Sequence, residues 1–453
     1  MARNTKWGLL AIGLTLAGCG GSGNTGTNGG GNTGGNNPGG NDPGTNGGGN
    51  PSGNIGASPS IAWIDGYPAF DDTFDAFDAT RWRRSDNWAS SEDFNAGWRE
   101  DHVRFSGGKL ELRLDDQPCA SNGGCSGRPY ASGEFASTRF HGYGRYEVRM
   151  KPAHASGTLT AFAITTGPFE WTRWDEIDIA FVGLNTRRFQ ASYITDGQRR
   201  DTGIDLPFDA ADDFHTYGIE WTREALHWYV DGKRVHTETG ARGPLPSQPG
   251  RILVNFWPGV GPSTESWMGR FTYPGTPLAS VYDELRYGPA APTELLEDFE
   301  TSGLWKQEDP GAQMSTWHQE GHQGQALVMS YWVKDSSHPN VARTFDTPRD
   351  WRGARHLNFW FRGTNTQDSF RLELRDNGAS AGTAERFEYR FQDDFVGWKW
   401  VSVPLGAFTR RTDWQPAGAP NDGLTLSAVH GLSFEPLSGN GHTILLDDIE
   451  LER

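Results

Sequence analysis

The chain has 453 residues, a formal net charge of -16 and no clusters of basic residues, which argues against nucleic acid or an anionic membrane surface as its partner. Its 19 Trp, in a chain of mean hydropathy -0.64, are a high aromatic load that serves protein cores and also stacking on the faces of sugars. The length is too great for one ordinary domain and favours two.

The first residues have the features of a secretion signal. Arg3 and Lys6 precede an apolar run, residues 7–17, that is too short to span a membrane. The run closes on Leu16-Ala17-Gly18-Cys19, which resembles a bacterial lipobox and implies cleavage before Cys19 and lipid attachment to it. We therefore expect residues 1–18 to be the signal peptide of a bacterial lipoprotein at the outer membrane or cell surface, with the lipid as its only membrane contact. The alternative is an ordinary secreted protein.

Three further segments follow the signal. Residues 19–60 are almost entirely Gly, Asn, Thr, Ser and Pro, so we expect a flexible linker with nothing to bury. Residues 61–290 and 291–453 are predicted to be two domains, separated where Gly288-Pro289-Ala290-Ala291-Pro292 breaks the pattern. Both are rich in short alternating runs and turn residues, and neither contains a long amphipathic helix. The sequence therefore predicts an all-β protein.

Two of the three cysteines remain after lipidation of Cys19. Cys119 and Cys125 bracket five small or polar residues, which predicts a loop disulfide in an oxidising compartment. A zinc site is disfavoured because no His lies near them.

Residues 175–182 alternate acids and aliphatics, which predicts a strand with one buried face. Ile177, Ile179 and Phe181 would enter a core, and Glu176, Asp178 and Ala180 would share the opposite face with Trp174. Two acids on one face of a strand indicate either that this face is exposed to solvent or that the acids have a chemical function.

The surrounding motifs resemble glycoside hydrolase family 16, in particular the bacterial lichenases, which are endo-β-1,3-1,4-glucanases. The similarity runs in order over roughly residues 64–288 and rests on residues 142–152, 174–179, 214–217, 228–232 and 254–257. It implies a concanavalin-like β-jelly-roll sandwich for the first domain. It also implies a β-glucan-like polysaccharide as the partner of a monomeric protein.

The same resemblance assigns roles to residues. Glu176 matches the nucleophile of a retaining glycosidase, and Asp178 matches an assisting acid that would hydrogen-bond and orient it. The acid/base position, whose carboxyl should lie about 5 Å from the nucleophile, is vacant because it holds Ala180. Matching substrate-binding positions are Glu134, Trp174, Asn255 and Trp257.

Other positions of the expected cleft also depart from the lichenase pattern, so a single engineered knock-out does not explain Ala180. They are Ala136, Ala163, Thr165, Ser192 and Ile194. Glu170 and Glu265 are the candidate acids near the cleft to replace the missing one, and a solvated surface carboxylate is the favoured interpretation of each.

Residues 357–363, 370–376 and 398–404 alternate as strands do, and this pattern resembles carbohydrate-binding module family 11, a galactose-binding-like jelly roll. Tyr331, Trp332, Tyr389 and Trp414 are candidates for stacking on a glycan, although core packing is the commoner use of any one of them. A purely structural or protein-binding sandwich is the alternative.

Calcium is the one cofactor that the resemblances imply, in a structural role, and none is implied for catalysis. Gly108 and Asp283 match a calcium site of the first domain, and Glu300 and Asp448 match one of the second.

Two functions follow from these patterns. The first is a surface lipoprotein of licheninase type, a retaining endo-glycosidase or transglycosidase acting through Glu176 and Asp178. The second is a catalytically disabled lipoprotein that captures polysaccharide, which Ala180 favours.

Overall fold

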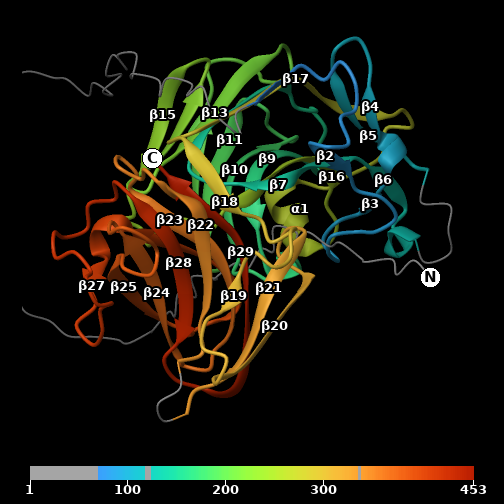
Figure 1. Ribbon diagram of the computed structural model, residues 1–453. Helices are drawn as coiled ribbons and strands as arrows, with labels where there is room; N and C mark the ends of the chain where they lie inside the picture. The colour runs from blue at the N-terminus through green and yellow to red at the C-terminus, as the bar shows by residue number, and fades with distance from the viewer. Residues whose placement is uncertain (1–69, 118–123, 335–337) are drawn as a thin grey trace, which may run out of the picture.

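A computed structural model describes residues 70–117, 124–334 and 338–453, which form two β-sandwiches joined in sequence (Figure 1). The predictions for the signal peptide, for Cys19 and for the linker lie outside the described residues. In the described ranges, no helix has the length and apolar character needed to cross a membrane.

The N-terminal sandwich consists of two antiparallel sheets. In spatial order, the first contains β15 (Lys233–Glu238), β14 (Leu226–Val230), β13 (His215–Trp221), β8 (Gly144–Lys151), β17 (Leu278–Pro289), β5 (Leu110–Leu114) and β4 (Val103–Phe105), with β1 (Phe70–Asp72) paired to β17. The second contains β12 (Gln198–Asp205), β11 (Arg188–Thr195), β10 (Asp175–Val182), β9 (Thr158–Thr166), β16 (Gly250–Pro258), β7 (Glu134–His141) and β2 (Trp82–Arg84).

Short elements complete this domain. They are the parallel pair β3 (Ala96–Trp98) and β6 (Tyr130–Ser132), the helix α1 (Pro262–Met268), and the 3-10 turns η1 (Glu100–His102), η2 (Gly124–Gly127) and η3 (Pro168–Glu170).

Strand β10 has the predicted bounds and the predicted alternation of side chains, but both of its faces are buried rather than one. Ile177, Ile179 and Phe181 are buried in the core between the two sheets, because alternate side chains of a strand point to opposite sides. Glu176, Asp178 and Ala180 lie on the other side, which we call the Glu176 face.

The C-terminal sandwich also has two sheets. One contains β20 (Gln313–Glu320), β21 (Gln325–Trp332), β29 (Asn440–Glu452), β23 (His356–Thr364) and β26 (Val396–Pro404), with β18 (Thr293–Glu297) paired to β29. The other contains β19 (Lys306–Gln307), β22 (Val341–Arg349), β28 (Val429–Pro436), β24 (Ser369–Asp376), β25 (Glu385–Gln392) and β27 (Thr409–Arg410), and the turn η4 (Leu405–Ala407) follows β26. The predicted all-β class with two jelly-roll sandwiches is confirmed.

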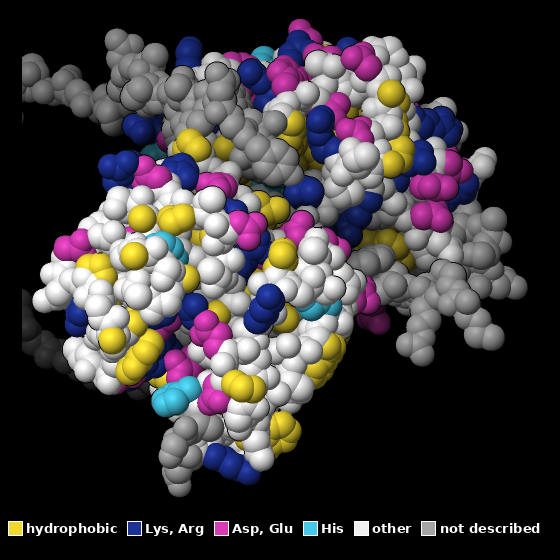
Figure 2. Space-filling view, in the orientation of Figure 1, with side chains coloured by type: hydrophobic (Ala, Val, Ile, Leu, Met, Phe, Trp, Pro, Cys, Tyr) yellow, Lys and Arg dark blue, Asp and Glu magenta, His cyan; other side chains and the backbone are white. Residues whose placement is uncertain are grey.

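The two sandwiches are in direct contact. The backbone N–H of Trp398 in the second domain donates to the carbonyl of Trp171 in the first at 2.6 Å, and Arg223 of the first domain pairs with Glu452 of the second at 2.6 Å. On the face drawn in Figure 2, acidic and basic side chains are interspersed over both domains.

Candidate active site

The sheet register places the residues of the Glu176 face in cross-strand rows. Glu176 lies opposite Thr165 of β9 and Ile194 of β11, and Asp178 lies opposite Ala163 and Ser192. Directly opposed residues in an antiparallel pair share a face. Four of the five positions expected to depart from the lichenase pattern are therefore the immediate neighbours of the two acids, and the fifth, Ala136, lies on β7.

Glu176 is held by two side chains that donate to the same oxygen. Thr165 Oγ1 and Trp174 Nε1 donate to Oε2 at 2.9 and 3.0 Å, and Glu176 is 4 % exposed. Among the described residues, no hydrogen bond reaches Oε1. The carboxylate is thus fixed through one oxygen and keeps the other available.

Asp178 is fully buried beside Glu176, and it differs from the expectation in its contacts. The predicted hydrogen bond to Glu176 is not formed, because neither oxygen of Asp178 has a hydrogen-bond partner in the described part of the chain. Its nearest cation is Arg199 of β12, at 3.5 Å. Burial raises the pKa of Asp178 to about 8, against the opposing charge of Arg199 and together with repulsion from Glu176.

Ala180 is fully buried in an apolar cluster. The cluster also contains Phe94, Leu159, Ala161, Trp257 and Met268. The predicted acid/base position is therefore packed with apolar side chains. A simple truncation of a glutamate would not by itself supply these contacts.

Trp257 belongs to this cluster, which corrects its prediction as a substrate-binding residue. The ring is 0 % exposed and stacks on Phe94 with centroids 3.7 Å apart. It presents no exposed surface to a sugar, because the segment before β3 covers it.

Glu134 and Asn255 are brought together as expected, on neighbouring strands. Glu134 accepts from Ser85 Oγ at 2.7 Å and from Asn255 Nδ2 at 3.4 Å. Burial raises the pKa of Glu134 to about 7 despite these hydrogen bonds and the charge of Arg83. Three strand spacings separate β7 from β10, about 14 Å. Glu134 therefore lies too far from Glu176 to form a retaining carboxyl pair.

Glu170 corrects the interpretation of that residue as a solvated surface acid. It is buried, and its carboxylate pairs with Arg251 Nε at 2.7 Å and with Arg83 at 3.5 Å. Glu265, on α1, is exposed as expected.

Sequence reasoning missed three residues of this face. Trp88 packs against Ala136, Ala163 and Leu253, so its side chain covers this part of the sheet. Arg199 and Arg251 place cations next to Asp178 and Glu170. Only the register of β12 and β16 against β10 could have indicated the two arginines.

The first predicted calcium site does not fit that ion. Asp283 Oδ1 accepts from Lys109 Nζ at 2.7 Å, and the other oxygen pairs with Arg149. Burial acts to raise the pKa of Asp283, but these two cations hold it below its usual value. A carboxylate already neutralised twice offers little to calcium, and Gly108 adds no second charge.

The second predicted calcium site is surrounded mainly by carboxylates rather than by cations. Burial, together with the carboxylates of Asp298 and Glu300, raises the pKa of Asp448 to about 7 against the charge of Arg139. Glu300 already accepts from the backbone N–H of Gln325 at 2.6 Å. Within the described ranges, no group of three or more His, Cys, Asp or Glu side chains is arranged to hold a metal. Calcium here stays a prediction.

Of the predicted disulfide pair, Cys125 is buried and disulfide-bonded. Cys119 lies outside the described residues.

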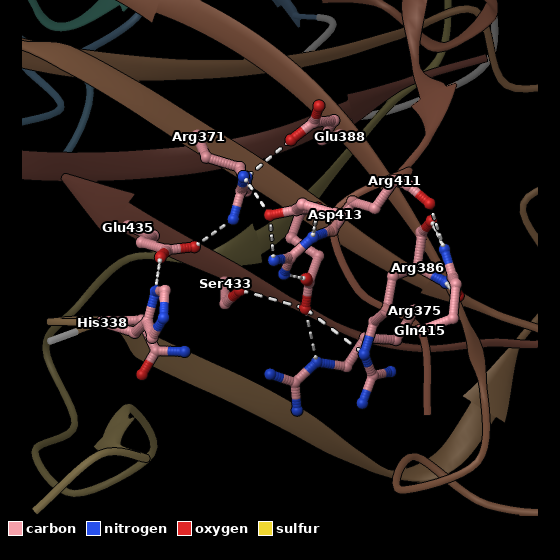
Figure 3. A network of polar contacts seen from close by, with 12 residues as sticks. His338, Arg371, Arg375, Arg386, Glu388, Arg411, Asp413, Gln415, Ser433 and Glu435 are labelled. Carbon is pink, nitrogen blue, oxygen red and sulfur yellow. Dashed lines mark hydrogen bonds and ion pairs between the residues drawn. The ribbon is translucent and has the colours of Figure 1, made fainter. Parts of the chain in front are cut away.

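The outward face of β24 and its neighbours carries an ion-pair network (Figure 3). Arg371 donates to Glu388, Glu435 and Asp413 at 2.6, 2.8 and 2.9 Å. Glu373, one position along the same face, pairs with three cations, Arg375, Arg386 and Arg411. Charged side chains of β24, β25 and β28 thus share one face of this sheet.

The predicted aromatic positions separate into two groups. Tyr331 is fully buried and donates to Asp368 at 2.9 Å, and Tyr389 packs against Phe408 of the core. Trp332 and Trp414 are 38 % and 52 % exposed. Trp414 is the one beside the network, with the guanidinium of Arg411 5.7 Å from its ring.

Comparison with known proteins gives two family matches. The description "Glycosyl hydrolases family 16" matches residues 90–273, and "Carbohydrate binding domain (family 11)" matches residues 287–452. A beta-glucanase of Brevibacillus brevis is 40 % identical over 224 residues, which cover 49 % of this chain and 82 % of that protein. A beta-glucanase of Acetivibrio thermocellus is 42 % identical over 218 residues, covering 48 % of this chain and 61 % of the relative.

Among solved structures, a prokaryotic beta-1,3-1,4-glucanase (lichenase) derived from a mouse hindgut metagenome aligns with a TM-score of 0.45 and 37 % identity. The alignment covers 49 % of this chain and 99 % of that one.

The paired acids on one face of a β-sandwich, followed by a carbohydrate-binding sandwich, define a glycoside hydrolase with an attached binding module. The chain belongs to glycosyl hydrolase family 16.

Proposed function

We propose that this protein is a retaining endo-glycosidase or transglycosidase acting on a β-glucan, of the β-1,3-1,4-glucanase type. The observation that carries the proposal is the state of Glu176. Oε2 is fixed by Thr165 and Trp174, and Oε1 accepts no hydrogen bond from the described residues. A carboxylate held this way is suited to attack an anomeric carbon in one defined direction.

In the first step, Oε1 of Glu176 forms a bond to the anomeric carbon as the bond to the leaving sugar oxygen breaks, and that oxygen takes its proton from solvent. In the second step, the hydroxyl of water or of an acceptor sugar displaces Glu176 and gives its proton to solvent. Asp178 remains protonated at neutral pH, since its pKa is raised to about 8, so it adds no second negative charge beside Glu176. Ala180 donates no proton, so leaving groups that need none are favoured.

The C-terminal domain would hold the polysaccharide near the Glu176 face, with Trp414 and the Arg371 network as contacts. The lipoprotein signal and linker at residues 1–60 would tether the enzyme to the outer membrane or cell surface and give it reach.

A specific observation favours a second function, capture of glycan without turnover. Ala180 is fully buried among apolar residues, so no described carboxyl occupies the acid/base position.

The deciding experiment is product release from barley β-glucan and from an aryl β-glucoside by the full chain and by Glu176→Gln. The enzyme proposal expects release from the aryl glucoside that Glu176→Gln abolishes, because its leaving group needs little protonation. Retention of β-glucan with no release from either substrate would instead establish the capture function.

A further inference from the structure

The segment between β9 and β10 leads directly to the proposed nucleophile. It contains η3 and then Trp171, Thr172, Arg173 and Trp174, and the last of these donates to Glu176. Its internal bonds are short-range. Thr172 N–H donates to the carbonyl of Gly167 at 3.2 Å, and the hydroxyls of Thr166 and Thr172 are 2.7 Å apart.

A strand of the C-terminal domain is bonded to this segment. The backbone N–H of Trp398, in β26, donates to the carbonyl of Trp171 at 2.6 Å, and Thr172 and Trp398 form a parallel β-bridge. The guanidinium of Arg362, in β23, lies 5.5 Å from the Trp171 ring. The contact is close because Gly397 has no side chain. A Cβ there would lie 2.3 Å from the Trp171 carbonyl oxygen.

A second set of hydrogen bonds connects β26 to Asp175, at the end of the same segment. Trp400 N–H, also in β26, donates to Gln248 Oε1 at 2.7 Å. The backbone N–H groups of Ser247 and Gln248 in turn donate to Asp175 Oδ2 at 2.8 and 3.1 Å. Asp175 immediately precedes Glu176.

A third route runs through aromatic rings. Arg251, the partner of Glu170, lies 4.1 Å from the ring of Phe140, and Phe140 lies 4.2 Å from His322 of the second domain. His322 stacks on Trp360 at 3.8 Å. The C-terminal domain therefore contacts the segment directly at Trp171. It is connected to Asp175 and to Glu170 through intervening residues.

From these contacts we infer that β26 of the C-terminal domain is a positioning element of the Glu176 centre, in addition to any role of that domain in holding glycan. The backbone of Gly397 and Trp398 fixes the segment of residues 167–174, and that segment sets the place of Trp174 and, through it, of Oε2. This inference rests on the proposed function, because Glu176 must be the nucleophile.

The test uses the full chain with Gly397→Ala, which adds a Cβ against the Trp171 carbonyl. Gly353→Ala is the matched control, since Gly353 has a similar positive φ, +86° against +92°, and its Cβ would meet nothing within 4 Å. Gln248→Ala, which removes the acceptor of Trp400 without touching β26, is a second variant in case Gly397→Ala disturbs its own strand.

Covalent labelling of Glu176 by a 2-deoxy-2-fluoro-β-cellobiosyl fluoride, followed by mass spectrometry, is the main measurement. Fluoride leaves without a protein acid, so Ala180 does not limit the reaction. We expect the maximal labelling rate to fall about tenfold in Gly397→Ala and about threefold in Gln248→Ala, with the reagent concentration at half-maximal rate unchanged. Hydrogen exchange at residues 167–174 should rise in both, and Gly353→Ala should match the unmodified protein.

The outcomes distinguish the positioning role of β26 from the role of Glu176 as nucleophile. Equal labelling rates, or unchanged exchange at residues 167–174, in Gly397→Ala and Gln248→Ala would overturn the positioning role while leaving Glu176 as nucleophile. If the unmodified protein is not labelled at Glu176, the proposed function and this inference both fail. Retention on a β-glucan gel should be the same for all variants, since the glycan-facing side of the second domain is untouched.

Discussion

The indole N–H of Trp174, the residue just before β10, donates to Oε2 of Glu176 at 3.0 Å. This hydrogen bond reaches the carboxylate from the side of the segment that enters β10. It links the conformation of that segment to the oxygen that does not attack.

Trp174→Phe should therefore slow the covalent labelling of Glu176 while leaving the fold intact. A hydrogen bond to a charged group contributes about 1.5–3 kcal/mol, which corresponds to a loss of at least about tenfold in rate. Trp171→Phe is the control, because Trp171 is 66 % exposed and contacts Trp398 through its backbone. Equal rates for Trp174→Phe and the unmodified protein would show that Thr165 alone positions Oε2.

Restoring a carboxyl at position 180 should destabilise the protein rather than restore an enzyme. Ala180→Glu would place an acid among Phe94, Leu159 and Trp257, which costs about 2–4 kcal/mol of unfolding free energy. Gln190→Glu is the control, since Gln190 lies opposite Ala180 on β11 and is partly exposed. Urea denaturation of the three proteins measures the difference. A stable Ala180→Glu protein with new activity on barley β-glucan would mean that the apolar cluster opens to admit substrate.

The strand that carries Glu176 could be predicted to the residue, because strict alternation of Ile177, Ile179 and Phe181 with acids is typical of a strand with one apolar and one polar face. The burial of the polar face as well could not be predicted from this pattern. The same local pattern also gave the direction of each side chain. Both results depend only on neighbours in sequence.

What covers that face could not be predicted. The burial of Trp257 depends on Phe94, which lies far away in sequence. Glu170 was interpreted as a surface acid because its partner Arg251 is 81 residues distant. The bond between Trp398 and Trp171 joins two domains and leaves no local signature in either. Contacts of this kind follow from the packed fold.

The pH dependence of stability should reflect buried carboxyls with raised pKa. Burial, with repulsion from Asp448 and Glu452, raises the pKa of Glu450 to about 8, and Glu450 lines a cavity of about 460 Å³ between the domains. The folded state then binds this proton more tightly than the unfolded state, so the free energy of unfolding falls as pH rises from about 4.5 to about 8. Glu450→Gln removes the effect.

We expect the unmodified protein to lose about 3.5 kcal/mol more than Glu450→Gln between pH 5 and pH 8 in urea denaturation. Glu224→Gln, a change at the rim of the same cavity, serves as the control. Parallel pH profiles for all three proteins would mean that Glu450 ionises as freely in the folded state as in the unfolded one.

Glycan retention by the C-terminal domain should depend on Trp414. Its ring is 52 % exposed beside Arg386 and Arg411, so it offers an apolar surface next to the polar groups of the Arg371 network. Stacking of a sugar on an exposed aromatic ring of this kind is worth about 1 kcal/mol or more, so Trp414→Ala should weaken retention on a β-glucan affinity gel about fivefold or more. Trp317→Ala is the matched control, because Trp317 is 43 % exposed on β20 of the other sheet. Loss of retention in Trp317→Ala with none in Trp414→Ala would move the glycan contact to the β20–β21 sheet.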